Sequence, residues 1–85
     1  MKIILHKNFL RNYKKLNNSD KKRFQERRNL FFNNPFDPIL NNHQLHGKYK
    51  KYRSINITSD LRVVYEQYVD DVIFIMIDTH SNLYG

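Results

Sequence analysis

Hydrophobic and polar positions alternate with two different periods along this chain of 85 residues. A short β-branched run at 2–5, KIIL, predicts a first strand. Apolar side chains then recur at helical spacing from about residue 8, which predicts a first helix; they are Phe9, Leu10, Tyr13 and Leu16. A second helix is predicted over about 20–33, with its N-cap at Ser19 and an inward face made of Phe24, Leu30, Phe31 and Phe32.

The segment NNPFDP ends this second helix, because each proline disfavours helix in the residue before it. From residue 43 the period becomes two, which is typical of strands. In KYKKYRSINIT, Ile55 and Ile57 mark the buried side, so Ser54 and Asn56 are expected on the opposite face. Two more strands follow after short turns, LRVVYEQY and VIFIMID. The last strand is apolar on both faces, so we expect it in the centre of the sheet.

These elements predict an α+β fold with the order β-α-α-β-β-β in a single domain that covers residues 1–85. The sheet is expected to have about four mostly antiparallel strands, with the two helices forming a hairpin on one of its faces. The other face should be open, polar and concave, and should display Ser54, Asn56 and Arg62.

Charge is distributed unevenly along the chain, whose net charge is +7. Residues 1–53 carry 14 Lys/Arg against three acids, a balance of +11, whereas residues 54–85 carry one Arg against five acids, a balance of −4. A cationic first part suits a polyanion, either nucleic acid or the ribosome, contacted through its phosphates. A solubilising surface or an acidic protein partner would explain the same charge.

Cysteine content and hydropathy narrow the class of protein. With no Cys and four His, we expect neither disulfides nor a structural zinc site, and we expect no metal or cofactor. The candidate carboxylates are too few and too dispersed for a two-metal site. The apolar run after Met1 is too short for a secretory signal, and no run approaches the length of a membrane span. We therefore expect a soluble cytoplasmic protein.

His80 is distinctive among the titratable residues because it directly follows an apolar strand, which would anchor it on rigid structure. Histidine exchanges protons near neutral pH, as general acid–base catalysis requires, although a histidine that only caps the strand end would give the same pattern. His43 lies in the loop segment NNHQLHG, where a solvated histidine is the simpler interpretation. Arg62 could grip a phosphate with its planar fork, or it could form an ion pair with Asp60 or Glu66.

Taken together, these side chains suit the metal-free cleavage of RNA. That reaction needs a base for the 2′-hydroxyl proton, a cation to stabilise the charged phosphorane and an acid for the leaving 5′-oxygen. His43 or Asp60 could be the base, and Arg62 could be the cation. His80 could be the acid, while Tyr84 could stack on an RNA base.

Two segments resemble the RelE/YafQ superfamily of type II toxins, and in particular its YafQ-like branch. The run HQLHGKYKKYRSINITSDLRVVY is similar to the YafQ-type order of a histidine, Leu-x-Gly, an aromatic and basic stretch ending in Tyr-Arg, and an aspartate before the third strand. The ending THSNLYG resembles the C-terminal sequence of that branch, which has Thr-His, a short polar step, and then Leu and an aromatic residue. The likeness covers most of the chain in element order, is specific from His43 to Tyr84, and implies the RelE-like toxin fold.

The resemblance implies roles for five residues. His43 matches the loop histidine of YafQ-type toxins, and Asp60 matches their catalytic aspartate. His80 matches the histidine that closes the last strand, and Tyr84 matches the C-terminal aromatic. Arg62 matches the arginine that RelE-type members place in this strand to hold the scissile phosphate.

Three positions depart from the family pattern. Asn56 stands where YafQ-type toxins have a second histidine, Leu61 replaces the usual tryptophan, and Met76 replaces an arginine of the last strand. Asn56 can support the site by hydrogen bonding but cannot shuttle a proton at neutral pH. We expect Arg62 to compensate for the arginine that is missing at Met76.

The resemblance also implies an activity and partners. The chain is expected to be an mRNA interferase, a ribosome-dependent endoribonuclease that cuts mRNA in the decoding site and is inhibited by a cognate antitoxin. The toxin alone is expected to be a monomer, and its complex with the antitoxin a larger assembly. The residues expected to contact ribosomal RNA are Lys21, Lys22, Arg23, Arg27 and Arg28 of the second helix and Lys48, Lys50, Lys51 and Arg53. Two alternatives stay open: a ParE-like toxin that binds gyrase, and a catalytically decayed interaction protein.

Overall fold

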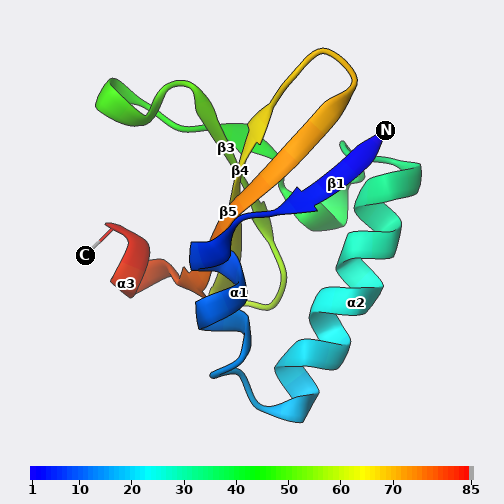
Figure 1. Cartoon of the computed structure of the whole chain (residues 1–85), viewed down its shortest axis with the longest axis vertical. Coiled ribbons are helices and arrows are strands. Elements are labelled where there is room, and N and C mark those ends of the chain that lie inside the picture. Colours follow the sequence, from blue (N-terminus) through cyan, green and yellow to red (C-terminus); the bar gives the residue numbers. More distant parts are fainter. Residues whose placement is uncertain (85) are drawn as a thin grey trace.

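The computed structural model describes residues 1–84, which form one mixed sheet with helices packed against it (Figure 1). The strands are β1 (Lys2–Leu5), β2 (His43–Gln44), β3 (Tyr52–Asn56), β4 (Leu61–Gln67) and β5 (Asp71–Thr79). The helices are α1 (Lys7–Tyr13), α2 (Asn18–Asn33) and α3 (His80–Tyr84), with 3-10 turns η1 (Pro38–Leu40) and η2 (Gly47–Tyr49). The predicted α+β class is confirmed, although α3 and the short strand β2 were not predicted.

The sheet has the strand order β1-β5-β4-β3-β2. β1 pairs with β5 in parallel, whereas the other three pairs are antiparallel. β5 is an interior strand, as its two apolar faces predicted, but β4 is the strand in the middle. The prediction of four strands was wrong by one because the two residues of β2 are too few to show a period in the sequence.

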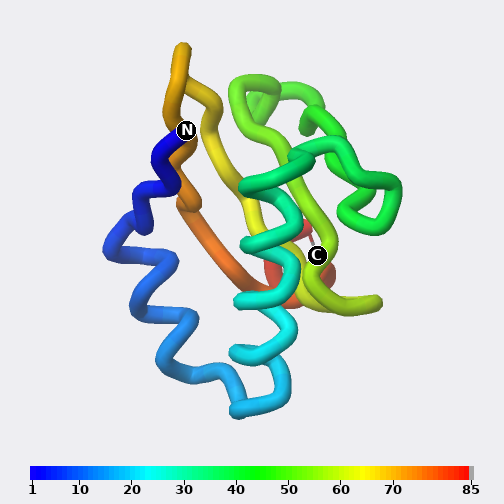
Figure 2. The backbone as a smooth tube through the Cα atoms, turned by 90° about the vertical axis from the view of Figure 1, so that its right-hand side faces the viewer, coloured from blue at the N-terminus to red at the C-terminus, as the bar shows by residue number. Residues whose placement is uncertain are grey.

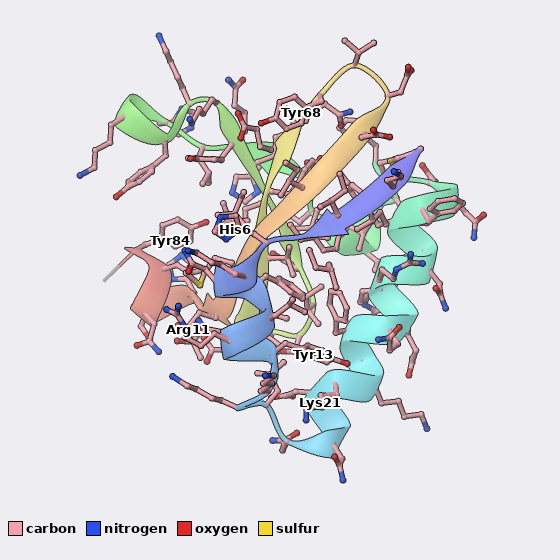
Figure 3. All side chains as sticks on the ribbon, in the orientation of Figure 1. His6, Arg11, Tyr13, Lys21, Tyr68 and Tyr84 are labelled. Atoms are coloured by element: carbon pink, nitrogen blue, oxygen red, sulfur yellow. The ribbon has the colours of Figure 1, made fainter. Side chains whose placement is uncertain are left out.

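The core lies between the sheet and the pair α1 and α2. Phe74 of β5 is fully buried, and its ring centroid lies 5.9 Å from that of Phe9 in α1 and 5.5 Å from that of Phe31 in α2. Tyr13 of α1 points toward α2, where Lys21 Nζ lies 5.7 Å from its ring centroid (Figure 3). The two helices therefore cover one face of the sheet, as predicted. Figure 2 shows α2 in front of the strands and α3 behind them, so α3 belongs to the other face.

Two apolar residues that were predicted to point inward are exposed instead. Leu10 is 43% exposed beside the buried Phe9, and Phe32 is 45% exposed beside the buried Phe31. Consecutive helical residues point about 100° apart, so only one member of each pair can face the core.

The start of α2 also differs from its prediction. The N-cap is Asn17, not Ser19, and its side-chain Oδ1 accepts a hydrogen bond from the Asp20 backbone N at 2.8 Å. Asparagine and serine are comparably good N-cap residues, so composition alone could not choose between the two positions.

Replacing Tyr65 by phenylalanine should reduce the loss of stability at alkaline pH. Tyr65 is almost fully buried, and burial raises the pKa of its phenol, although the hydrogen bond from Asn42 Nδ2 at 2.7 Å opposes this. In the unfolded chain the phenol ionises at its ordinary pKa of about 10. The stability that this group contributes is therefore complete below that pH and is lost as the pH rises toward the folded value. Urea unfolding at pH 8 and pH 11 should show a smaller difference for Tyr65→Phe than for the parent. An equal difference would contradict this assignment.

Candidate active site

The β3–β4 turn and the end of β5 meet at one rim of the sheet. Leu61 pairs with Thr79, and Arg62 pairs with Asp78, so the start of β4 lies beside the end of β5. His80 follows directly, and its backbone N donates a hydrogen bond to the Asp60 carbonyl oxygen at 2.9 Å. Residues 60 and 80 are thus neighbours in space because of strand register, although they are twenty positions apart in the sequence.

The turn that carries Asp60 is held by Thr58. Thr58 Oγ1 accepts hydrogen bonds from the backbone N of Asp60 at 3.3 Å and of Leu61 at 3.0 Å. The turn is closed by the Ile57 backbone N, which donates to the Leu61 carbonyl at 2.8 Å. Asp60 itself is exposed, so its carboxylate is available to solvent at the rim.

Arg62 binds the same turn from the adjacent strand. Its Nη1 donates to the carbonyls of Thr58 at 2.8 Å and Leu61 at 3.2 Å, and its Nη2 donates to the carbonyl of Ser59 at 2.9 Å. The ion pair with Asp60 or Glu66 that the sequence left open is therefore replaced by bonds to backbone carbonyls. These bonds use three of the five N–H groups of the guanidinium and fix its position next to Asp60.

α3 folds back after β5 and carries the other two candidate residues. His80 and Tyr84 lie one turn apart, with their ring centroids 4.9 Å apart, and both are exposed. Leu83 is half-buried, and its side chain anchors α3 on the domain. Figure 3 shows Tyr84 on the side of the molecule away from α2.

A polar network that the sequence did not reveal connects α3 to α1. Asp78 Oδ1 accepts from Asn82 Nδ2 of α3 at 2.9 Å and from the Thr79 backbone N at 2.8 Å. Asp78 Oδ2 accepts from Asn12 Nδ2 of α1 at 3.3 Å, and Asn12 also donates to the Ile77 carbonyl at 3.1 Å. No sequence motif indicates this network, because its members come from three separate elements.

Replacing Asp78 by alanine should loosen α3 without unfolding the sheet. The substitution removes the acceptor that α1 and α3 share, and a lost hydrogen bond to a charged group costs about 1.5–3 kcal/mol. Amide hydrogen exchange should accelerate over 80–84 by tenfold or more, while β4 and β5 keep their protection. Asp70→Ala, at an exposed carboxylate of the β4–β5 turn, is the matched control. Uniform acceleration over the whole chain would show that Asp78 stabilises the fold generally and not α3 in particular.

Ser54 and Asn56 share the face of the sheet that carries Arg62. Asn56 pairs directly with Arg62 in the β3–β4 register, and Ser54 pairs with Val64. The prediction that Ser54 is displayed to solvent was wrong: it is fully buried, because its small side chain lies between the paired strands on either side. Within the described chain, Ser54 Oγ and Asn56 Oδ1 are buried without a hydrogen-bond partner. Most buried polar atoms in proteins have a hydrogen-bond partner, so these two acceptors are exceptions.

His43 lies at the opposite edge of this face. It is in β2 and not in a loop, it pairs with Ser54, and its Nδ1 lies 2.8 Å from the Asn41 carbonyl oxygen. Three strand spacings separate β2 from β5, which is about 14 Å at the level of the backbone. The structure therefore groups Asp60, Arg62 and His80 at one rim and leaves His43 apart from them.

Two cationic residues of α2 lie close to the turn at this rim, and the other cations differ in how exposed they are. Arg23 and Arg27 of α2 line a hollow of about 250 Å³ together with Thr58 and Ser59, so α2 presents charge toward the turn that carries Asp60. Lys48, Lys50 and Lys51 are exposed in and beside η2; on α2, Lys22 is exposed and Lys21 and Arg28 are half-buried.

Arg53 differs from the exposed lysines that precede it in the sequence. It is half-buried, its Nε donates to Asn42 Oδ1 at 2.8 Å, and its guanidinium lies 5.3 Å from the Phe36 ring centroid. It also pairs with Tyr65, whose side chain belongs to the core. Arg53 therefore points to the helical side of the sheet, away from the face that carries Asn56 and Arg62.

Residues 1–84 contain neither a cluster of metal ligands nor a helix that could span a membrane. No group of three or more His, Cys, Asp or Glu side chains in this range is arranged to hold a metal ion. None of the helices described is long and apolar enough to cross a membrane.

Comparison with known proteins identifies the family. Over residues 1–85 the chain matches the family described as "Bacterial toxin of type II toxin-antitoxin system, YafQ". Its structure is similar to that of YafQ from E. coli strain BL21(DE3), with a TM-score of 0.84 and 22% identity over 98% of this chain and 97% of that chain.

Two further solved structures show the same fold. YafQ in the E. coli DinJ-YafQ complex has a TM-score of 0.81 and 22% identity, over 98% of this chain and 96% of that one. A copper-bound mutant toxin from Helicobacter pylori has a TM-score of 0.76 and 28% identity, over 99% of both chains. The sequence has no significant match among curated proteins. Fold, element order and the whole-length family match agree, and the chain belongs to the YafQ family of bacterial toxins of type II toxin–antitoxin systems.

Proposed function

We propose that this toxin is a ribosome-dependent endoribonuclease that cleaves mRNA without a metal ion. The observation that carries the proposal is the hydrogen bond of 2.9 Å from the His80 backbone N to the Asp60 carbonyl, which holds these two residues at one rim. Arg62 is held at the same turn. A proton-exchanging imidazole, a carboxylate and a guanidinium are the three groups that this reaction requires.

The proposed reaction is a transfer within the RNA strand. The base removes the proton of a 2′-hydroxyl, whose oxygen then attacks the adjacent phosphorus and forms a cyclic phosphate. The bond from phosphorus to the 5′-oxygen breaks, and the acid protonates that oxygen, which leaves as a hydroxyl group. Asp60 is the favoured base, since it lies beside His80 whereas His43 is three strands away. His80 is then the acid, because it is exposed and adjacent.

Three further residues support this reaction in the proposal. Arg62 stabilises the negative charge of the phosphorane with the N–H groups that the turn leaves unused. Asn56, which is half-buried and directly paired with Arg62, hydrogen-bonds the RNA with its side-chain amide. Tyr84 stacks on a base next to His80.

The proposed partners follow from charge and family membership. The cations of α2 and of the segment around η2 contact ribosomal RNA through phosphates. A cognate antitoxin inhibits the toxin, since YafQ of E. coli is described in complex with DinJ. The toxin alone is a monomer in this proposal, it forms a larger complex with its antitoxin, and it acts in the cytoplasm, where ribosomes are.

A translation reaction with and without ribosomes tests this function. The purified toxin is added to a defined mRNA, and the new 5′ ends are mapped to single nucleotides. Cuts at fixed codon positions that require ribosomes are expected. Intact mRNA, together with growth arrest and altered DNA supercoiling in cells, would contradict the proposal and indicate a ParE-like toxin that binds gyrase. Intact mRNA without growth arrest would instead indicate a catalytically decayed protein.

A further inference from the structure

α3 is too short to hold its own conformation. It has five residues, His80–Tyr84, whereas isolated helices shorter than about 12–15 residues are only marginally stable in water. Its first residue is His80, the proposed acid, whose imidazole contacts the ring of Tyr84, with the two centroids 4.9 Å apart. Within residues 1–84 that imidazole makes no hydrogen bond. The contacts that fix α3 to the domain therefore decide where the imidazole points.

Two side chains at the end of β5 fix the first turn of α3. Thr79 Oγ1 accepts a hydrogen bond from the Asn82 backbone N at 3.2 Å, which is the geometry of an N-cap. Asp78 Oδ1 accepts from Asn82 Nδ2 at 2.9 Å and from the Thr79 backbone N at 2.8 Å. Because His80 lies between Thr79 and Asn82 in the chain, its backbone follows the position of the Asp78 carboxylate.

Asn12 of α1 holds the Asp78 carboxylate by its other oxygen. Asn12 Nδ2 donates to Asp78 Oδ2 at 3.3 Å, to the Ile77 carbonyl oxygen at 3.1 Å and to Met76 Sδ at 3.0 Å. The bond to Asp78 is the longest of the three, but its acceptor is charged, and such bonds are about twice as strong as neutral ones. An asparagine amide has two N–H groups, and serving three acceptors requires both of them.

α1 is a rigid support for this contact. β1 pairs with β5 only as far as Leu5 and Phe74, and α1 begins two residues after Leu5 and lies along the rest of β5 (Figure 1). Phe9 of α1 is fully buried, and its ring centroid lies 5.9 Å from that of Phe74. The core therefore fixes α1, and Asn12 transmits this fixed position to the end of β5.

We propose that Asn12 is a positioning residue for His80, which acts through Asp78 and the first turn of α3 instead of contacting RNA. The contacts run from the core through α1 to the Asp78 carboxylate, and from there to Thr79 and Asn82 on either side of His80. The inference rests on the proposed function, because His80 acts as the acid only if the toxin cleaves RNA. Displacing a reacting group by about 1 Å can lower a rate about 10²-fold, so loss of this support should slow cleavage.

NMR of the histidine rings tests this positioning without any cleavage reaction. In the parent toxin, the Cε1 proton of His80 should show a ring-current shift from Tyr84, identified by its loss in Tyr84→Leu. Asn12→Ala should move this signal toward its position in the unfolded chain, because α3 frays without the support. The signals of His6, at the start of α1, and of His43, at the far edge of the sheet, should stay unchanged and show that the fold is intact.

Cleavage kinetics on ribosomes that carry mRNA test the consequence for His80. Asn12→Ala should lower kcat about tenfold while KM for the ribosome–mRNA complex stays unchanged, because the cations that bind RNA are untouched. In a His80→Ala background the same substitution should have no further effect, since no imidazole remains to be positioned. A tenfold loss in both backgrounds would show that Asn12 supports the fold in general, and would overturn the inference.

Further variants separate the amide donor from packing. Asn12→Asp keeps the shape but places a carboxylate beside Asp78, so it should lose at least as much activity as Asn12→Ala. Adding Asp78→Asn restores a donor and an acceptor with exchanged roles and should recover part of the loss. Asn8→Ala removes a half-buried amide of the same helix whose side chain makes no hydrogen bond within residues 1–84, and should cleave like the parent. Parent-like cleavage by Asn12→Asp, or an equal loss in Asn8→Ala, would refute the role of the Asn12 amide.

Failure of this inference and failure of the proposed function give different results. If the parent cleaves mRNA but the His80 signal does not move in Asn12→Ala, the positioning role is wrong and the proposed function stands. If the parent leaves mRNA intact on ribosomes, the proposed function is wrong, and the role of Asn12 in cleavage falls with it.

Discussion

Replacing His80 by alanine should lower the rate of ribosome-dependent mRNA cleavage by a hundredfold or more. General acid–base catalysis by one side chain contributes about 10²–10⁴-fold, and His80 is the histidine that strand register places beside Asp60. The substitution should barely affect the fold, since His80 is exposed and its backbone hydrogen bond to residue 60 does not require the imidazole. The rate is measured as the appearance of mapped 5′ ends per ribosome over time.

Two histidines of the same chain serve as controls for this substitution. His46 is exposed at the start of η2 and makes no side-chain capping bond, so His46→Ala should cleave at the parent rate. His43→Ala should reduce cleavage less than His80→Ala, because His43 lies at the far edge of the face. If His43→Ala shows the larger loss, the base is His43 and the assignment to Asp60 is wrong. If His80→Ala cleaves at the parent rate, His80 is not the acid.

Replacing Arg62 by alanine should have a comparably large effect, about 10²–10³-fold on the cleavage rate. Removing one preorganised donor that stabilises transition-state charge costs about this much in other enzymes. Arg62 also holds the turn through the carbonyls of Thr58 and Ser59, so the alanine variant loses a structural contact as well. The core should survive, because Arg62 lies on the face of the sheet opposite the helices.

Arg62→Lys separates these two effects. Lysine keeps the charge but lacks the planar fork that donates to several carbonyls at once. Hydrogen exchange of the amides at 58–61 reports the turn, while mapped 5′ ends report cleavage. Recovery of cleavage in Arg62→Lys despite a loosened turn would show that charge is the essential property. Parent-level cleavage in Arg62→Ala would end the proposal that Arg62 compensates for the arginine missing at Met76. Lys14→Ala, an exposed cation of the helical layer, controls for lost charge.

The alternation of apolar and polar positions was enough to predict four of the five strands and both long helices. β1, for example, lies at Lys2–Leu5 as predicted, and α2 ends at Asn33. The failures arose where local pattern carries no information. Phe31 and Phe32 are equally apolar, and only the direction of α2 over the sheet decides that Phe31 packs on Tyr65 and Phe74.

The candidate site was predictable only in part, for a related reason. His80 and Asp60 were identified by residue type and by resemblance, but their adjacency depends on the pairing of Leu61 with Thr79. His43 was also identified by residue type and by resemblance, yet the addition of β2 to the far edge of the sheet separates it from them. Asn12 and Asp78 gave no signal, because a hydrogen bond between distant elements leaves no trace in local periodicity.

Local chemistry alone determined four of the strands and the helices α1 and α2, which residues can exchange protons or hold phosphate, and that the first part of the chain suits a polyanion. These properties depend on side-chain type and on spacing within a few residues. The order of the strands, the irregularity of register between Val64 and Tyr65 of β4, and the return of α3 over the sheet were decided by tertiary packing. They depend on contacts between residues up to about seventy positions apart, such as Lys2 with Asp71, and the energy of such contacts exists only once the whole sheet has formed.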